Sequence, residues 1–312
     1  MRAVRTLSGH VQVVDVAPPQ GDGIRVRIRS AGICSSDLHL IAAGWPITST
    51  LGHEMAGELS NGTRVAIEPI APCGHCDSCT RGEYALCRRG ACMIYGVSHD
   101  GGMADEIIVP ARCLVRLPDG LRPSDACLVE PLAVALHGLR RVPLNPREPM
   151  AIVGAGSLGL CTAAMASGYV SGLTVFARHD AQREAAVRLG AQVDGSGEFP
   201  VVVDCAGTTE AMAHCVTLCR PGGTILMLAT YWQSLTIPAL EIGMKSLRLV
   251  ASSLYDQCGL SRDVDVAAAA LAANPLIAST LITHRFPIDA APEAFQMANN
   301  RAAGAIKVVL EP

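Results

Sequence analysis

The 312-residue sequence has few aromatic side chains, few charged side chains and no long hydrophobic run. Aromatic residues make up 4% of the chain and charged residues 17%. The longest apolar windows stop well short of the roughly 20 residues that cross a bilayer. The formal net charge is -3, and no run of Lys and Arg offers a binding surface for nucleic acid or an anionic membrane. We therefore expect neither a membrane protein nor a nucleic-acid-binding protein.

The N-terminus also lacks the features of a secretion signal. Residues 1–16 alternate in hydrophobicity like a strand and contain neither an apolar core segment nor a small-residue cleavage site. This pattern predicts a cytoplasmic protein. In that compartment the 13 cysteines, an odd number, indicate metal ligands and small buried side chains instead of a disulfide framework.

The stretch AIVGAGSLG, residues 151–159, predicts a dinucleotide site. An apolar run leads into three glycines and then into an alanine-rich segment, the order expected of a strand, a tight turn and a helix. The first glycine allows the turn, the second lets a pyrophosphate approach the backbone, and the third packs helix on strand, while the helix N-terminus offers free N–H groups. The predicted cofactor contacts are Gly154, Gly156, Ser157, Leu158 and Gly159.

Beyond residue 150, strand and helix signals alternate. Strands are expected at 173–176, 201–204 and 224–228, with a helix over 182–189 that ends at a glycine. This alternation predicts a doubly wound parallel sheet. Cys205 and Ala206 directly follow a predicted strand, so we expect them to line the crevice on the nicotinamide side.

Four cysteines between residues 73 and 87 are spaced for a closed metal site. Cys73, Cys76 and Cys79 occupy every third position, and Cys87 follows eight residues later. Four thiolates can complete a tetrahedron and leave no place for a substrate, so a structural zinc is expected here. The alternative is the zinc ribbon of a nucleic-acid-binding protein, which would require more basic and aromatic neighbours than this segment has.

A second set of potential ligands lies nearer the N-terminus. Cys34 opens the sequence CSSDLH, residues 34–39, and His53 and Glu54 belong to the sequence GHE, residues 52–54. A thiolate, an imidazole and a carboxylate suit zinc, and three protein ligands with one open position are what a catalytic zinc needs. The sequence therefore predicts a catalytic metal site in addition to the four-cysteine site.

Taken in order, these motifs resemble the zinc-dependent medium-chain alcohol and polyol dehydrogenases. The resemblance rests on CSSDLH, GHE, the four cysteines, EPL at 130–132 and the glycine turn, and it extends to the last strand at 307–310. It implies an α/β protein in which a GroES-like antiparallel β catalytic domain carries an inserted doubly wound Rossmann nucleotide-binding domain. We predict the catalytic domain at 1–137 and 278–312, with a structural-zinc lobe at 72–90, and the nucleotide-binding domain at 138–277.

The resemblance also implies a ligand set for the catalytic zinc. Cys34 and His53 would bind the metal together with either Glu54 or Glu130, and the residues leave this choice open. With the four-cysteine site, the chain would hold two Zn²⁺ ions.

The same resemblance implies roles for three residues near Cys34. Ser36 and His39 would carry the proton of the alcohol toward the surface, for which an imidazole is suited. Asp37 would orient His53 and fix its tautomer. The alternative for Asp37 is a helix N-cap.

The choice of dinucleotide depends on the end of the second strand of the nucleotide-binding domain. The position where the family carries an aspartate is Ala177 here, followed by Arg178 and His179. Two potential cations and no carboxylate favour the 2′-phosphate of NADP. The alternative is NAD, with Arg178 stacked on the adenine or Asp180 bound to the ribose.

The resemblance implies a reversible hydride transfer between a nicotinamide cofactor and a secondary alcohol or ketone, with a polyol, sugar or cyclitol as the expected substrate. The scarcity of aromatic residues argues against a bulky aryl alcohol. A homodimer or homotetramer is expected. Two alternatives remain: a zinc-independent quinone or enoyl reductase of the same superfamily, and a non-catalytic protein that senses NADP or uses its zinc lobe to contact nucleic acid.

Overall fold

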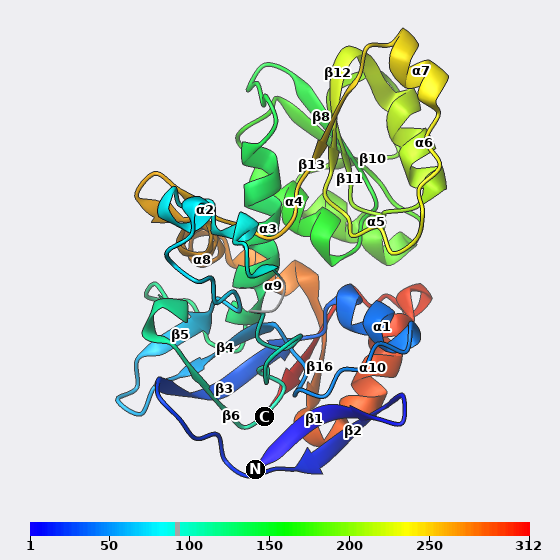
Figure 1. The fold of residues 1–312 in the computed structure, drawn as a ribbon. Helices are drawn as coiled ribbons and strands as arrows, with labels where there is room; N and C mark the ends of the chain where they lie inside the picture. The colour runs from blue at the N-terminus through cyan, green and yellow to red at the C-terminus, as the bar shows by residue number, and fades with distance from the viewer. Residues whose placement is uncertain (91–93) are drawn as a thin grey trace. The chain divides into compact units, whose positions relative to one another are not determined.

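The computed structural model describes residues 1–90 and 94–312, and the chain divides into two compact units (Figure 1). The first comprises Met1–Glu130 and Asp256–Pro312, and the second is Pro131–Tyr255. One unit is thus a continuous run of the chain, and the other is formed by two separate stretches on either side of it. The first boundary falls inside helix α3 (Val129–Arg140).

The second boundary precedes the predicted one by 22 residues, because residues 256–277 pack with the first unit. Arg262 explains this placement. Its guanidinium donates to Glu68, to the backbone oxygens of Arg112 and Leu114, and to Asp265, with distances of 2.7–3.1 Å. Contacts made by one side chain with residues far away in the sequence leave no local pattern, so the sequence did not reveal them.

The first unit is built on a mainly antiparallel sheet in the order β16-β17-β3-β4-β5-β7, with β6 paired to β3. Its strands are β3 (Ile24–Gly32), β4 (Glu54–Glu58), β5 (Arg64–Ile67), β6 (Glu106–Val109), β7 (Leu114–Arg116), β16 (Ile282–Pro287) and β17 (Lys307–Glu311). Two separate hairpins are formed by β1 (Arg2–Leu7) with β2 (His10–Asp15) and by β14 (Gln257–Cys258) with β15 (Ser261–Arg262).

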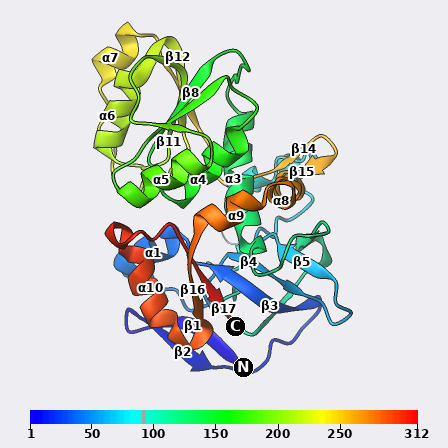
Figure 2. The same cartoon turned by 180° about the vertical axis from the view of Figure 1, so that it is seen from behind.

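Strand β3 shows the expected period of two. Val26 and Ile28 are buried in the core, whereas Arg25, Arg27 and Arg29, which alternate with them, are exposed. The C-terminal strand β17 lies between β16 and β3, so the end of the chain joins the sheet whose earliest strand is β3 (Figure 2).

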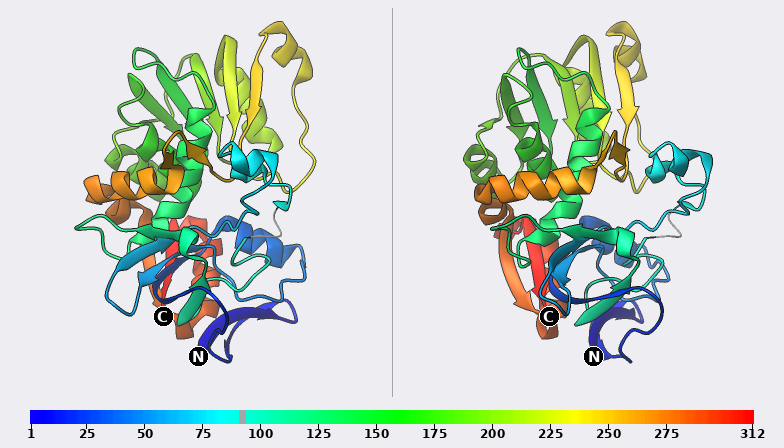
Figure 3. Two further views of the ribbon diagram at one scale, coloured as in Figure 1. Left: turned by 60° about the vertical axis from the view of Figure 1, so that its left-hand side comes forward. Right: turned by 90° about the vertical axis from the view of Figure 1, so that its left-hand side faces the viewer.

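Short helices complete the first unit. They are α1 (Ser35–Ala42), α2 (Asp77–Thr80), α8 (Asp263–Ala273), α9 (Pro275–Leu281) and α10 (Ala291–Asn299), with 3-10 turns η1 (Tyr84–Leu86), η3 (Ala111–Cys113), η4 (Ala126–Leu128), η5 (Ile288–Ala290) and η6 (Arg301–Ala303). The segment with α2 and η1 forms a loop-rich lobe, coloured cyan in Figure 3, that stands away from strands β1 and β2.

Within the described residues no single helix has the length and apolarity to cross a membrane. Only α8 and α9 taken together pass such a test, and the chain bends by 92° between them.

The second unit is a parallel six-stranded sheet in the order β10-β9-β8-β11-β12-β13. The strands are β8 (Pro149–Val153), β9 (Gly172–Phe176), β10 (Gln192–Val193), β11 (Phe199–Asp204), β12 (Cys219–Met227) and β13 (Arg248–Ala251), and the helices are α4 (Ser157–Ala166), α5 (Asp180–Arg188), α6 (Thr209–Leu218) and α7 (Ala239–Met244). The strand order reverses between β8 and β11, which confirms the predicted doubly wound fold.

Strands β8 and β11 are buried at nearly every position because helices cover the sheet. Ala151 and Val153 of β8 share a core cluster with Met212 and Cys215 of α6. The intervening Ile152 faces the other side, and α4 and α5 contact β8, β9 and β10. Ligands of such sheets bind at the carboxyl ends of the strands, at the reversal point.

Candidate active site

Cys34, His53 and Glu54 come together in the first unit. Cys34 follows β3, while His53 and Glu54 stand at the start of β4, and Gly32 pairs with Glu54 across the two antiparallel strands. One ligand atom from each residue lies within 4.8 Å of the others. A Cβ on Gly32 would collide with the Glu54 carboxylate, so the glycine makes this approach possible.

Asp37 contacts both neighbouring candidate ligands. Its Oδ2 accepts a 3.0 Å hydrogen bond from the backbone N–H of Cys34, and its Oδ1 lies 3.4 Å from His53 Nδ1. Asp37 is 1% exposed. It is thus placed to orient His53 with Nε2 turned away from the carboxylate. Asp37 is the third residue of α1 and not its N-cap, which is Cys34, so the N-cap alternative does not hold in that form.

The environment of His53 favours positive charge. Burial acts against the imidazolium, but Asp37 and Cys34 outweigh it and hold the pKa of His53 well above its ordinary value. A metal cation bound here would replace that proton, because a histidine ligand must be neutral. The donor set and its charge therefore fit zinc.

Ser36 and His39 lie on α1, three residues apart and hence on the same side of the helix. Ser36 Oγ is 3.4 Å from His53 Nε2. Burial, with a smaller effect from Arg301, lowers the pKa of His39. The structure thus brings Ser36 to the candidate metal site and His39 one helical turn further along.

Lys307 is a neighbour of Glu54 for which no role was predicted from the sequence. Its ammonium donates to both Glu54 oxygens, at 2.7 Å to Oε1, and to the backbone oxygen of Ile33 at 3.2 Å. Both side chains are almost completely buried. A lone lysine in the apolar strand AIKVVL was the available signal, since a buried charge requires a partner.

Glu130 lies close to this cluster but not in its centre. Its oxygens are not part of the group whose ligand atoms approach within 4.8 Å among the described residues. Burial raises the pKa of Glu130 to about 7, and the neighbouring His53 opposes this effect. The geometry thus places Glu54 nearer to the other two donors than Glu130.

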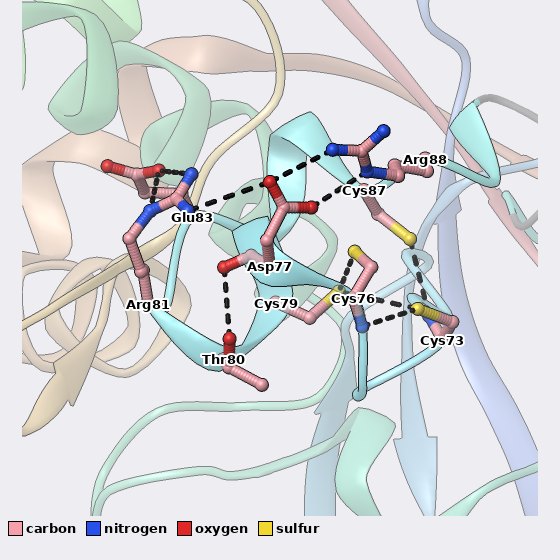
Figure 4. A network of polar contacts seen from close by, with 9 residues as sticks. All are labelled: Cys73, Cys76, Asp77, Cys79, Thr80, Arg81, Glu83, Cys87 and Arg88. Carbon is pink, nitrogen blue, oxygen red and sulfur yellow. Dashed lines mark hydrogen bonds and ion pairs between the residues drawn. The ribbon is translucent and has the colours of Figure 1, made fainter.

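The four cysteines of the lobe form the second cluster. Figure 4 shows the sulfur atoms of Cys73, Cys76, Cys79 and Cys87 turned toward one another, and their ligand atoms lie within 4.8 Å. The Sγ–Sγ distances from Cys79 are 3.5 Å to Cys76 and 3.8 Å to Cys73. A tetrahedron with Zn–S bonds of about 2.3 Å has edges of about 3.8 Å. The lobe therefore has the donor set and the size for a closed zinc site.

In the second unit the glycine turn has the geometry of a phosphate site. Gly154 has φ +100°, and a Cβ on Gly159 would collide with the Gly154 carbonyl. A Cβ on Gly156 would meet only open space. Ser157 Oγ is buried and has no hydrogen-bond partner among the described residues. Leu158 follows in the first turn of α4, whose N-terminal N–H groups complete a cradle that fits a pyrophosphate.

The end of β9 carries no carboxylate, as expected. Ala177 is buried, Arg178 is exposed and His179 is the N-cap of α5. One carboxylate does reach this place: Asp194 Oδ1 accepts from the Ala177 N–H at 3.3 Å, and its Oδ2 binds Arg183 Nε at 2.7 Å. The sequence analysis missed Asp194 because it follows the neighbouring strand β10.

Cys205 and Ala206 follow β11, at the reversal point. The Cys205 sulfur lies 3.7 Å from Thr162 Oγ1 of α4, and burial raises the pKa of the thiol to about 12. Ala206 lies against Gly154, since a Cβ on that glycine would come 3.0 Å from the alanine. Both residues thus border the glycine turn.

The chain is similar to known dehydrogenases along most of its length. Residues 20–119 match the family described as the alcohol dehydrogenase GroES-like domain. L-galactonate-5-dehydrogenase of Escherichia coli (strain K12) is 28% identical over 319 residues, which cover 92% of this chain and 92% of that protein. L-arabinitol 4-dehydrogenase of Talaromyces emersonii is 31% identical over 341 residues, covering 94% and 85%. The chain belongs to the zinc-dependent medium-chain dehydrogenase family.

Two solved structures extend the likeness over the whole chain. A zinc-binding dehydrogenase of Sinorhizobium meliloti, bound to NADP, has a TM-score of 0.88 at 28% identity and covers 100% of this chain and 99% of its own. An alcohol dehydrogenase of Escherichia coli CFT073, complexed with NADH, has a TM-score of 0.86 at 25% identity, with coverage of 100% and 99%.

Family membership confirms the predicted fold class and the predicted activity. The protein is a dehydrogenase, an oxidoreductase that acts on CH–OH groups with a nicotinamide cofactor. The relatives named above are dehydrogenases, which speaks against the quinone-reductase and the non-catalytic alternatives.

Proposed function

We propose that the protein oxidises a secondary hydroxyl of a polyol, sugar or sugar acid, with a catalytic zinc held by Cys34, His53 and Glu54. The approach of these three donors to within 4.8 Å carries the proposal. A zinc ion supplies a Lewis acid that lowers the pKa of an alcohol. The names of the relatives, which specify L-galactonate and L-arabinitol, support a polyhydroxylated substrate.

In this proposal Glu54 rather than Glu130 is the third ligand, because its oxygens lie closer to the other donors. Lys307 donates to both oxygens of the Glu54 carboxylate and holds it in place. Asp37 fixes His53 through Nδ1, so that Nε2 is the atom available to the metal. The carboxyl group of Glu130 then lies beside the site without binding the metal.

Ser36 and His39 form the proposed proton path. The Ser36 hydroxyl lies beside His53 Nε2 and can take up the proton that leaves an alcohol while its own proton passes on toward His39. His39 lies one turn along α1, and its lowered pKa keeps the imidazole neutral and able to receive a proton.

Two matched variants test the metal assignments. We expect Cys34→Ala to lose one of two zinc ions per chain and to lose turnover of secondary polyols completely. Cys79→Ser should lose the other zinc and keep measurable turnover in folded protein. Metal analysis and initial rates on one sample measure both. Full activity of Cys34→Ala would refute the proposal.

We further propose NADP as the preferred cofactor. Ala177 offers no carboxylate to repel a 2′-phosphate, and Arg178 is exposed beside it. Two carboxylates lie nearby, but both pair with Arg183, Asp194 at 2.7 Å and Asp180 at 3.2 Å. Because the arginine compensates their negative charge, they leave the site open to a 2′-phosphate. The NADP-bound structure supports this choice and the NADH-bound structure supports the alternative.

The ratio of kcat/KM for NADP and NAD tests this choice. Arg178→Ala should lower the ratio about tenfold or more, since an arginine–phosphate contact is charge-assisted. Arg147→Ala is the matched control, because this exposed arginine precedes β8 at the opposite, amino-terminal edge of the sheet. An unchanged ratio in Arg178→Ala would favour NAD.

A homo-oligomer through the second unit is also proposed. On α7, Leu240 and Met244 are 79% and 80% exposed, and Leu249 on the edge strand β13 is 37% exposed. Apolar side chains grouped at a free sheet edge are typical of a subunit contact. Sedimentation of Leu240→Glu/Met244→Glu beside the wild type should show a lower mass.

A further inference from the structure

Asp204, the last residue of β11, carries a carboxylate that is completely buried. It is 0% exposed, and it forms no ion pair within the described residues. Its Oδ1 accepts from the backbone N–H groups of Ala206 and Gly207, both at 2.9 Å, and its Oδ2 accepts from the Tyr231 hydroxyl at 2.8 Å. These three hydrogen bonds compensate for the burial of the carboxylate.

The backbone of Asp204 binds the neighbouring loop as well. Its carbonyl oxygen accepts from the N–H groups of Leu228 at 3.1 Å and Ala229 at 3.0 Å, directly after β12. Asp204 thus contacts the 205–207 loop after β11 and the 228–231 loop after β12. Tyr231 is the only side chain of the second loop that contacts the Asp204 carboxylate among the described residues.

These loops also pack on one another through glycines. A Cβ on Gly207 would lie 2.9 Å from the Cβ of Ala229, and a Cβ on Gly154 would lie 3.0 Å from Ala206. No side chain therefore separates the glycine turn, the 205–207 loop and the 228–231 loop. A shift of one loop would displace the next.

The position of these loops places them beside one half of the bound cofactor. This step rests on the proposed function. The pyrophosphate belongs at the glycine turn after β8, and the adenosine ribose belongs at the end of β9 near Ala177. The nicotinamide half then extends to the other side of the reversal point, over the ends of β11 and β12. These are the ends that Asp204 holds.

We propose that Asp204 and Tyr231 are positioning residues that fix the two loops supporting the nicotinamide half of the dinucleotide. They act through the loop backbones and not by touching the reacting atoms. In the observed link the phenol is the donor. Burial and the negative charge of Asp204 raise the pKa of Tyr231, so the hydroxyl keeps its proton at neutral pH.

Tyr231→Phe tests the proposal because it removes one hydroxyl and keeps the ring. In the zinc-loaded protein without substrate, we expect the Kd for NADPH, followed by its fluorescence, to rise about tenfold, the loss expected for a hydrogen bond to a charged group. The Kd for 2′,5′-ADP, which contains only the adenosine half, should not change. Tyr169→Phe, at an exposed tyrosine of the same unit, is the control.

Asp204→Asn supplies a second measurement. An asparagine can accept from the two loop N–H groups with its oxygen and donate to the Tyr231 hydroxyl with its nitrogen, so NADPH affinity should stay within about threefold of wild type. An unchanged Kd for NADPH in Tyr231→Phe, an equal loss for NADPH and 2′,5′-ADP, or a loss in Asp204→Asn as large as that in Tyr231→Phe would overturn the proposal. Wild type that binds neither ligand would instead refute the proposed function.

Discussion

Lys307 and Glu54 stand 253 positions apart in the sequence and form a buried ion pair. Removing one partner leaves an uncompensated buried charge. In metal-free protein, Lys307→Met should therefore lower the free energy of unfolding by about 3–5 kcal/mol. Urea unfolding followed by circular dichroism measures the change.

The double variant Lys307→Met/Glu54→Gln is the internal control for this pair. It also removes the unpaired charge of Glu54 and should recover part of the lost free energy of unfolding. Equal stability of Lys307→Met and wild type would contradict a stabilising role of the lysine.

His39 allows a prediction on pH. Burial, with help from the positive charge of Arg301, lowers the pKa of His39, so the imidazole stays neutral to lower pH than an ordinary histidine. A relay base must be neutral to accept a proton. Arg301→Gln should raise this pKa and move the acid limb of kcat/KM for alcohol oxidation to higher pH. The exposed Arg116→Gln should leave the profile in place, and a profile that His39→Gln does not alter would exclude the relay.

Among single residues, those that could be predicted from the sequence are potential metal ligands and their neighbours that stand close together in one short motif. Cys34 with Asp37, and His53 with Glu54, stand within a few positions of each other. Lys307 and Asp194 escaped prediction because each reaches its partner across strands, and the register of a sheet is set by the whole fold and not by nearby residues.

At the scale of elements, the glycine turn offers a pair of contrasting variants. Gly159→Ala should destabilise the cofactor-free protein by about 1–3 kcal/mol, because its Cβ would collide with the Gly154 carbonyl. Gly156→Ala has room for its Cβ and should leave stability unchanged while weakening NADPH binding, since the methyl group would occupy the approach of the pyrophosphate. Equal melting temperatures for both variants would contradict the observed packing.

The elements themselves were largely predictable. Strand β8, the glycine turn and helix α4 follow from an apolar run, three glycines and an alanine-rich stretch. The link between Asp204 and Tyr231 was not predictable in this way, because Tyr231 lies in an irregular loop with no periodicity. Only the folded sheet shows that the two loops end beside each other.

At the scale of the molecule, the lobe joins distant parts of the first unit. Tyr84 donates to Glu68 at 2.6 Å, and Gln257 donates its N–H to the oxygen of Gly82 at 3.2 Å. Loss of the lobe metal should therefore loosen more than the lobe. We expect Cys79→Ser to melt roughly 5–10 °C below wild type, because a structural zinc contributes directly to folding. Retention of two zinc ions in this variant would contradict the assignment.

The order of the two units was predictable from the order of the motifs, whereas the second boundary was not. Residues 256–277 carry no motif, and their membership in the first unit depends on contacts such as those of Arg262.

The candidate zinc ligands all belong to Met1–Glu130, and the dinucleotide cradle belongs wholly to the uninterrupted run Pro131–Tyr255. A segment from a relative with another coenzyme preference can thus be grafted into this chain with only two splice points, one at either end of that run. Coenzyme choice and metal chemistry are inherited on separate stretches of the gene, so evolution or an engineer can exchange one and keep the other.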